Sequence, residues 1–178
     1  MLADGFEEIE GLTVVDVLRR GKVELQTVSV TGKLEINGSH GIKVIADILF
    51  EDADFASAEM IVLPGGLKGT NTLLEHEGLK KKLIQFHEED KWLAAICAAP
   101  SVLGKYGILD GKKAICYPGF EDKLLGADIQ AGAKVVQYRK VVTSRGMGTS
   151  MDFALKLLEL IKDAETSLKV ADSIQYGN

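Results

Sequence analysis

One cysteine in this chain lies where a reactive thiol could be both positioned and activated. Cys97 follows residues 92–96, an apolar run typical of a buried strand, and precedes a helical pattern with Pro100 in its first turn. A side chain at such a corner points toward the start of the helix, whose partial positive charge favours thiolate over thiol. The spacing therefore predicts a nucleophile elbow in which cysteine is the nucleophile.

A plainer interpretation of Cys97 stays open beside this one. A free cysteine is often no more than a small buried hydrophobic residue. The small neighbours Ala95, Ala98 and Ala99 leave the sulfur accessible, which favours the reactive interpretation. The other cysteine, Cys116, lies within an apolar strand pattern and is expected to be buried and inert.

Histidine, the usual base for such a thiol, is poorly placed in this sequence. All three histidines precede Cys97: His76 and His87 are typical of surface positions, and His40 lies in a turn and stays a candidate. Class I glutamine amidotransferases take a histidine from after the cysteine, and related intracellular proteases place it directly next, where this chain has Ala98. Neither arrangement is available, and no histidine pair has metal-ligand spacing, so we expect no metal site.

Glu10 is the alternative partner for the thiol. It precedes Val14 and Val17 at helical spacing and so faces partly apolar ground. A buried carboxylic acid has a raised pKa, could donate a hydrogen bond to a Cys97 thiolate, and could later move protons. The sequence equally allows a solvated first-turn glutamate that favours the helix dipole.

Two backbone groups could complete an oxyanion hole. Gly66 offers an N–H that no side chain shields, and Ala98 offers one at the start of the helix. A tight strand-to-loop turn without any function also explains residues 64–66.

Alternating strand and helix patterns indicate the fold that must position these groups. Several strands are apolar throughout, which predicts an α/β domain, residues 1–178, with a mostly parallel sheet covered on both faces. Loops 64–66, 97–99 and 144–146 and the segment 4–10 should converge at the carboxyl ends of the strands. Expected helices cover residues 7–20, 77–89, 100–106, 149–161 and 164–174, and expected strands cover 22–30, 34–36, 42–45, 60–63, 92–96, 113–116, 134–138 and 140–143.

Composition excludes several classes of partner. The formal net charge of -5 argues against nucleic acid or an acidic membrane surface, and no apolar run approaches the roughly 18 residues of a membrane span. We expect no signal peptide, and two cysteines make no disulfide framework, so a reducing cytoplasm is expected. The first three residues resemble the end of a strand, and the sequence leaves open what precedes them.

Four motifs occur in order and in register along the chain. They read ADGFEEIE at residues 3–10, VLPGG at 62–66, AAICAAP at 94–100 and TSRGMGT at 143–149. Together they resemble the ThiJ/PfpI superfamily, in the branch that contains the Parkinson-disease-associated protein deglycase and its bacterial relatives.

This resemblance implies a three-layer flavodoxin-like sandwich, usually a homodimer, without a cofactor. It implies that Cys97 is the reactive cysteine, that Glu10 is its protonated partner, and that Gly66 and Ala98 are the backbone donors. Gly65, Tyr117, His40 and Arg145 are then pocket candidates. Two positions depart from the family: Tyr117 replaces a proposed proton-carrying histidine, and His40 replaces an arginine that approaches the partner's pocket.

Three hypotheses follow. The first is an enzyme acting on small reactive carbonyls, either a glyoxalase III-like lyase or a deglycase-type hydrolase. The second is a non-enzymatic redox sensor or stress chaperone, since an accessible thiolate oxidises readily. The third is an unrelated small-molecule binder, because fold alone does not define function. For the dimer interface, the candidates are Val14, Val15 and Leu18 of the first helix.

Overall fold

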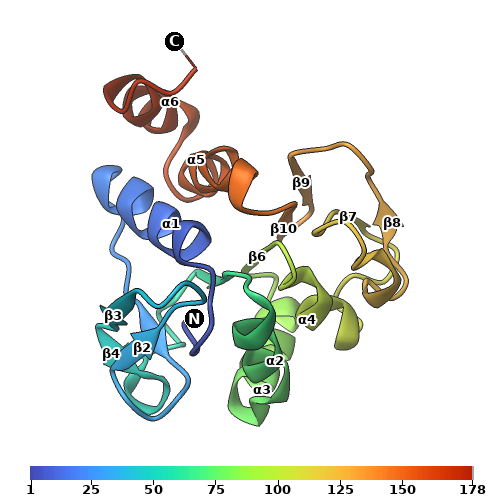
Figure 1. Cartoon of the computed structure of the whole chain (residues 1–178). Coiled ribbons are helices and arrows are strands. Elements are labelled where there is room, and N and C mark those ends of the chain that lie inside the picture. Colours follow the sequence, from blue (N-terminus) through green and yellow to red (C-terminus); the bar gives the residue numbers. More distant parts are fainter. Residues whose placement is uncertain (178) are drawn as a thin grey trace.

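A central four-stranded sheet divides the molecule into layers, as the computed structural model of residues 1–177 shows (Figure 1). Its strand order is β5 (Met60–Leu63), β6 (Trp92–Ile96), β10 (Val141–Ser144) and β9 (Val135–Tyr138). The first three strands are mutually parallel, and β9 runs antiparallel to β10. The predicted α/β class with a mostly parallel sheet is therefore confirmed.

Helices cover both faces of this sheet (Figure 1). One group comprises α1 (Glu8–Arg20), α5 (Ser150–Ile161) and α6 (Ala164–Ser173), and the other comprises α2 (Leu67–Glu75), α3 (Glu77–Glu88) and α4 (Pro100–Lys105). Side chains of β6 alternate between the two cores: Ile96 belongs to the core that contains Phe153 of α5, and Leu93 to the core that contains Phe86 of α3. A strand buried on both sides needs apolar residues at every position, which explains its unbroken apolar run.

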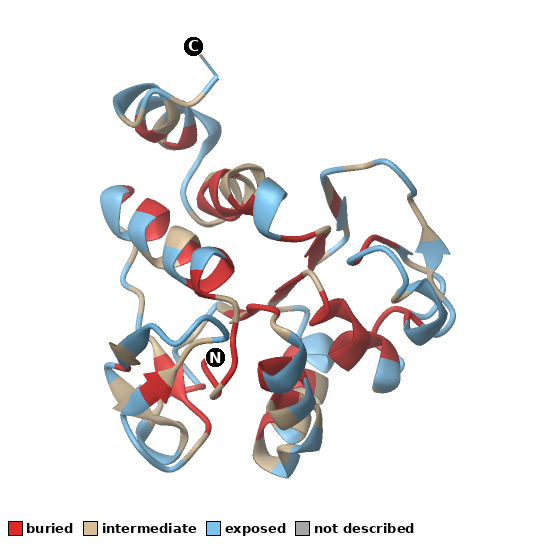
Figure 2. Cartoon of the chain, viewed as in Figure 1, coloured by how far each residue is buried: buried red, intermediate tan, exposed pale blue. Residues whose placement is uncertain are grey.

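Short strand pairs complete the fold at its periphery. They are the parallel pair β1 (Val28–Ser29) and β4 (Ile48–Leu49), the antiparallel hairpin β2 (Glu35–Asn37) and β3 (Lys43–Ile45), and the parallel pair β7 (Lys113–Ala114) and β8 (Asp128–Ile129). Single 3₁₀ turns lie at Phe50–Asp52, Glu121–Lys123 and Met147–Thr149. Buried residues concentrate in the sheet and on the inner faces of the helices (Figure 2). Among residues 1–177, no helix has both the length and the apolar character that crossing a bilayer requires.

Two predicted elements differ from the structure. The expected strand 22–30 forms a ladder only at Val28–Ser29, and the expected loop after residue 66 contains α2 instead. Gly69 and several polar residues of α2 have low helix propensity, but the glycine is needed for packing. A Cβ on Gly69 would lie 2.8 Å from the backbone nitrogen of Phe6, so only glycine lets α2 approach the turn before α1.

The predicted dimer face of α1 is also wrong in part. Val14 and Leu18 are 4% and 3% exposed and pack in the same core as Phe153. They cover the sheet of their own chain and are not available to a partner. The outward face of α1 carries Ile9 and Leu12 instead.

Candidate active site

Segments far apart in the sequence meet at the carboxyl ends of β5, β6 and β10. Main-chain hydrogen bonds join them: Glu7 N–H donates to Gly65 O at 2.9 Å, Cys97 N–H to Ser144 O at 3.0 Å, and Tyr117 N–H to Cys97 O at 2.8 Å. The predicted convergence of segment 4–10 with loops 64–66, 97–99 and 144–146 is confirmed. Because the bonds are between backbone groups, the fold itself holds the candidate residues together.

Cys97 occupies the corner between β6 and α4 in an uncommon backbone conformation. Its φ is 65°, in the left-handed region that costs a non-glycine residue roughly 1–2 kcal/mol. Residues after it are small, and Pro100 begins α4, where its missing N–H leaves no hydrogen bond unmade. The side chain is half-buried, so the sulfur lies within the site and is still partly open to solvent.

Glu10 reaches the same place from the first turn of α1. Glu7 caps this helix, because its carboxylate accepts from the Glu10 N–H at 2.8 Å. The Glu10 side chain is 1% exposed, which decides against a solvated glutamate. Its Oε2 accepts from Gly65 N–H at 2.9 Å, and its Oε1 has no hydrogen-bond partner among residues 1–177. The carboxyl group therefore keeps one oxygen free for chemistry.

Gly65 and Gly66 allow the close approach of these groups. A Cβ on Gly65 would lie 2.6 Å from both Glu10 Oε2 and Cys97 Cβ, and 3.1 Å from Cys97 Sγ. Gly66 has a φ of 86°, and a Cβ there would meet the backbone of Gly5 and lie 2.6 Å from the nitrogen of Glu7. No other residue type fits either position without displacing its neighbours.

Glu10 and Cys97 change each other's acidity. Burial raises the pKa of Glu10 to about 7, although the Cys97 side chain and the Gly65 N–H favour its charged form. Burial and the adjacent Glu10 carboxylate raise the pKa of Cys97 to about 12. Because the groups interact strongly, their titration belongs to the pair and not to either residue alone, and Glu10 ionises before Cys97.

The direction of this shift is opposite to the one expected from the start of the helix alone. The backbone N–H groups of Gly66 and Ala98 do act in the expected direction and lower the pKa of Cys97. Burial and the negative charge of Glu10 outweigh them. Above pH 7 the pair keeps one proton, and that proton resides mainly on the Cys97 sulfur. Glu10 is the nearby base that can accept it.

Tyr117, Arg145 and Gly146 lie at the rim of the site. The ring of Tyr117 is half exposed, and a Cβ on Gly146 would lie 3.2 Å from it and 3.8 Å from Glu10 Oε1. Arg145 follows the strand residue that binds the Cys97 backbone, and its guanidinium makes no hydrogen bond or ion pair within residues 1–177. Both side chains are thus free to contact a bound molecule.

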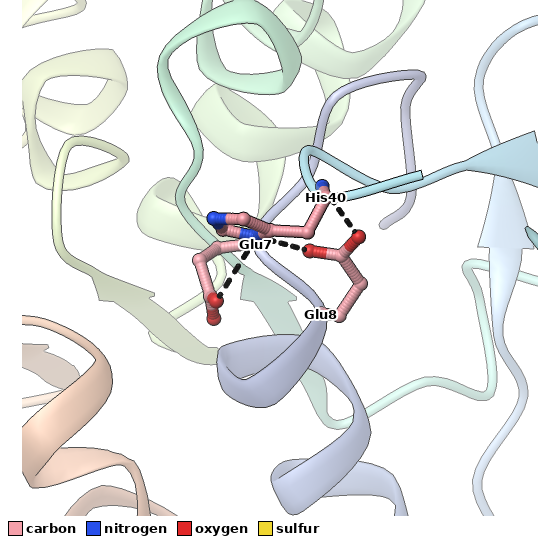
Figure 3. Close-up of side chains that lie close together, drawn as sticks. All are labelled: Glu7, Glu8 and His40. Atoms are coloured by element: carbon pink, nitrogen blue, oxygen red, sulfur yellow. Dashed lines mark hydrogen bonds and ion pairs between the residues drawn. The ribbon is translucent and has the colours of Figure 1, made fainter. Parts of the chain in front are cut away.

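His40 joins a separate cluster with Glu7 and Glu8 (Figure 3). Its Nδ1 lies 3.0 Å from Glu8 Oε2 and its backbone N–H donates to Glu8 Oε1 at 2.7 Å. Burial alone would raise the pKa of Glu8, but the hydrogen bonds from His40 and Ser39 lower it to about 2. Glu8 in turn raises the pKa of His40.

This cluster holds the β2–β3 loop against the start of α1 through hydrogen bonds to Glu8, and we call it the Glu8 latch. Both Glu8 oxygens already accept hydrogen bonds, including one from Ser39 Oγ at 2.9 Å, so a metal ion would have to displace them. None of the three histidines forms a hydrogen bond or an ion pair with Cys97 within residues 1–177. No local pattern pointed to this role of Glu8, because its partners Ser39 and His40 lie about 30 residues away.

Cys116 has the environment expected of an inert thiol. It is 1% exposed, and burial, with Glu121 and Asp122 nearby, raises its pKa to about 12. A buried thiol without a base reacts slowly with external reagents. Cys116 is therefore a natural internal control for Cys97.

The fold and site define a three-layer α/β protein with a cysteine at a strand-to-helix corner beside a buried glutamate. The pattern described as the DJ-1/PfpI family matches residues 1–160. The chain belongs to the DJ-1/PfpI family.

Curated relatives extend over nearly the whole chain. Protein DJ-1 homolog B of Arabidopsis thaliana is 38% identical over 171 residues, which is 96% of this chain and 39% of that protein. The Parkinson disease protein 7 homolog of Danio rerio is 35% identical over 173 residues, which is 96% of this chain and 92% of that protein. The chain spans less than half the length of the two Arabidopsis relatives it matches.

Solved structures agree with this assignment. Oxidised DJ-1 of Toxoplasma gondii superposes with a TM-score of 0.94 at 34% identity, covering 99% of this chain and 96% of that one. DJ-1beta of Drosophila melanogaster superposes with the same TM-score at 31% identity and the same coverage. The flavodoxin-like fold of these DJ-1 proteins, implied by the sequence motifs, is thereby confirmed.

Proposed function

We propose that this protein is a cysteine-dependent enzyme that converts small reactive carbonyls to hydroxy acids without glutathione. The observation that carries the proposal is the contact of Glu10 and Cys97 across Gly65, with two backbone N–H groups directed at the sulfur. One relative is the glutathione-independent glyoxalase DJR-1.2 of Caenorhabditis elegans. It is 31% identical over 161 residues, which is 89% of this chain and 84% of that protein.

The proposed reaction begins with Glu10 as a base. Its carboxylate accepts the Cys97 thiol proton while the sulfur attacks the aldehyde carbon of methylglyoxal. The developing alkoxide is stabilised by the N–H groups of Gly66 and Ala98, and receives the proton to give a hemithioacetal. A base near pKa 7 suits these transfers at neutral pH.

The second half of the reaction moves hydrogen within the substrate. Glu10 removes the proton from the hemithioacetal carbon, and the resulting enediol is protonated on the neighbouring carbon. This gives a thioester of lactate on Cys97. Water then cleaves the carbon–sulfur bond, releasing lactate and restoring the thiol, so one methylglyoxal and one water give one lactic acid without an external oxidant.

Lactate formation from methylglyoxal tests the proposal. Cys97→Ser should abolish turnover, and Glu10→Gln should reduce it by roughly 10²- to 10⁴-fold, the usual worth of acid–base catalysis. Cys116→Ser and Glu77→Gln, at a buried thiol and an exposed glutamate on α3, are the matched controls and should keep wild-type rates. Equal rates in wild type and Cys97→Ser would refute the proposal. A deglycase-type hydrolase would instead release lactate only from early adducts of methylglyoxal and not from free methylglyoxal.

Redox sensing through Cys97 is the second candidate. The sulfur is half-buried beside two backbone donors and a carboxyl group that can hold an oxidised sulfur acid. The similar structure from Toxoplasma gondii is of an oxidised DJ-1. Intact mass after mild peroxide should show addition of two oxygens, located on Cys97. Addition on Cys116 alone would rule this role out.

We also propose that the chain forms a homodimer through an apolar patch on α1 and the β2–β3 hairpin. The patch consists of Ile9, Leu12, Ile42 and Ile45, which are 50%, 37%, 52% and 68% exposed. The Ile42 N–H lies 3.4 Å from Glu8 Oε1, so the hairpin and the start of α1 form one surface. Such a patch is typical of an interaction surface. Function in a reducing cytoplasm is consistent with both cysteines being free.

A further inference from the structure

Two large apolar side chains are exposed beside the proposed active site. Tyr117 and Met147 are 50% and 55% exposed. Each belongs to a segment that builds the site: Tyr117 N–H donates to Cys97 O at 2.8 Å, and Met147 directly follows Gly146. The catalytic pair therefore has an apolar surface next to it that the two reacting side chains do not explain.

Tyr117 and Met147 adjoin the same oxygen of Glu10. A Cβ on Gly146 would lie 3.2 Å from Tyr117 Cδ2 and 3.8 Å from Glu10 Oε1, so the ring and the carboxyl group flank one glycine. The backbone N–H of Met147 lies close enough to Glu10 to favour its charged form. Because Gly65 N–H already holds Oε2, the oxygen on this side is Oε1, which has no hydrogen-bond partner within residues 1–177.

A second aromatic residue supports the ring of Tyr117. The centroids of the Tyr117 and Phe120 rings are 6.5 Å apart and their planes meet at 84°, the edge-to-face arrangement that aromatic rings prefer. The Tyr117 hydroxyl forms no hydrogen bond with Glu10 or Cys97 within residues 1–177. The part of Tyr117 that adjoins the site is therefore the face or edge of its ring.

The proposed reaction determines which part of a substrate meets these two side chains. Cys97 Sγ attacks the aldehyde carbon, and a proton then reaches the neighbouring carbon, which carries the substituent of the substrate. Because Glu10 moves that proton, the substituted carbon has to come within hydrogen-bond reach of Glu10 Oε1. Its substituent then lies beside Tyr117 and Met147.

The surroundings of this position favour an uncharged, apolar substituent. Above about pH 7 Glu10 is ionised, and its negative charge repels an acidic group placed next to it. An aromatic ring and a thioether both pack favourably on a flat apolar group. Arg145, two residues before Met147, is the cation that an acidic substituent would need, and it defines the competing arrangement.

We propose that Tyr117 and Met147 form a substituent subsite that selects 2-oxoaldehydes with an aromatic or similarly bulky apolar group over methylglyoxal. This inference rests on the proposed function and extends it from the reacting carbons to the rest of the substrate. The reaction stays balanced, because one phenylglyoxal and one water give one mandelic acid. Tyr117 acts through its ring as a specificity residue, and the proton transfers remain with Glu10.

Steady-state kinetics with phenylglyoxal and methylglyoxal test the subsite. The measured quantity is the ratio of kcat/KM for the two substrates in each variant, divided by the same ratio in wild type, which cancels the unequal reactivity of the free aldehydes. Tyr117→Ala and Met147→Ala should each lower this ratio about tenfold, mainly by raising KM for phenylglyoxal. Leu168→Ala, on exposed α6, is the matched control and should keep the wild-type ratio. An unchanged ratio in either subsite variant would overturn the proposal.

Conservative variants separate a ring that binds substrate from a hydroxyl that carries protons. Tyr117→Phe and Met147→Leu keep the apolar surface, so both should keep the ratio within about twofold of wild type. Equal loss of kcat for both substrates in Tyr117→Phe, with the ratio unchanged in Tyr117→Ala, would assign Tyr117 to proton transfer and overturn the proposal. A wild-type preference for 4-carboxyphenylglyoxal over phenylglyoxal that Arg145→Gln abolishes would also overturn it.

A binding experiment separates failure of the subsite from failure of the proposed function. 2-Hydroxyacetophenone and hydroxyacetone lack the aldehyde, so they probe the subsite without turnover. The first should protect Cys97 from iodoacetamide at a concentration about tenfold below the second, and Tyr117→Ala should remove most of this difference. Such protection in a protein that turns over neither aldehyde would refute the proposed enzyme and support the subsite. Equal protection by the two compounds in a protein that forms lactate would overturn the subsite alone.

Discussion

Glu10 and Cys97 approach each other across a single glycine: the Cβ position of Gly65 is 2.6 Å from Glu10 Oε2 and 2.6 Å from Cys97 Cβ. One residue comes from the first turn of α1 and the other from the end of β6. Their separation depends on the absence of a side chain at residue 65. The chemistry proposed for the site depends on that separation.

Gly65→Ala should therefore abolish most activity while the fold persists. The added methyl group must push Glu10 and Cys97 apart, which we expect to lower kcat at least 100-fold and the free energy of unfolding by about 1–3 kcal/mol. Gly148→Ala is the matched control, because nothing lies within 4 Å of a Cβ there. Steady-state kinetics and urea unfolding of both variants test this, and full activity in Gly65→Ala would be inconsistent with it.

Glu10 should make stability fall as pH rises through the weakly acidic range. In the unfolded chain this carboxyl ionises near its usual 4.5, but in the folded protein its pKa is about 7. Between these values only the unfolded state ionises, so folding loses about 3 kcal/mol by pH 7.

Glu10→Gln removes that dependence. The unfolding free energy of the variant relative to wild type should rise by about 3 kcal/mol from pH 4.5 to pH 7, because other titrating groups are common to both. Urea unfolding across this range measures the difference. A constant difference would mean that Glu10 is ionised at acidic pH in the folded protein.

Glu8 should have the opposite pH dependence. Its folded pKa of about 2 lies below its usual 4.5, so its stabilisation is present above pH 4.5 and lost as pH falls toward 2. Glu8→Gln should cost about 2 kcal/mol at pH 7, since charge-assisted bonds from His40 and Ser39 are lost, and less at pH 3. Glu35→Gln is the matched control. It removes an exposed ion pair with Lys43 and should lower the free energy of unfolding by under about 0.5 kcal/mol. Equal costs for the two variants would exclude a latch at Glu8.

Ile45 tests the proposed dimer surface. Ile45→Glu adds a charge at the most exposed member of the apolar patch and should weaken dimerisation at least 100-fold. Leu168→Glu, on an equally exposed leucine of α6, should leave the dimer intact. Light scattering coupled to size exclusion gives the mass of each. A wild-type chain that stays monomeric at high concentration would remove the patch from consideration.

Local patterns in the sequence were sufficient for most of the elements and for the meeting of the site segments. The apolar run before Cys97 and Pro100 after it predict a strand, a corner and a helix, and the structure has all three. Properties that depend on distant neighbours were not predictable. The pKa of Cys97 is shifted in the direction opposite to the one expected, because burial and then the adjacent Glu10 carboxylate raise it, and no local pattern reports either.

The same limit explains the misassigned segments. Residues 22–30 have the composition of a strand, but within residues 1–177 a ladder forms only at Val28–Ser29, which pairs with β4. Helix α2 looks like a loop in sequence because Gly69 is required by its contact with Phe6 and not by helix propensity. Pairing of Glu8 with His40 likewise follows from the fold alone.

The pH dependence of Cys97 alkylation tests the central claim most directly, namely that Cys97 and Glu10 act as one titrating pair. Iodoacetamide reacts with the thiolate, and mass spectrometry separates Cys97 from buried Cys116. In wild type the rate at Cys97 should rise through about pH 7 and then level off, because Glu10, once ionised, can accept the thiol proton as the sulfur reacts. Glu10→Gln should lack this step and react only as pH rises toward the pKa of the buried thiol. A wild-type rate that first rises near the ordinary thiol value of about 8.5, or an identical profile in Glu10→Gln, would contradict the account.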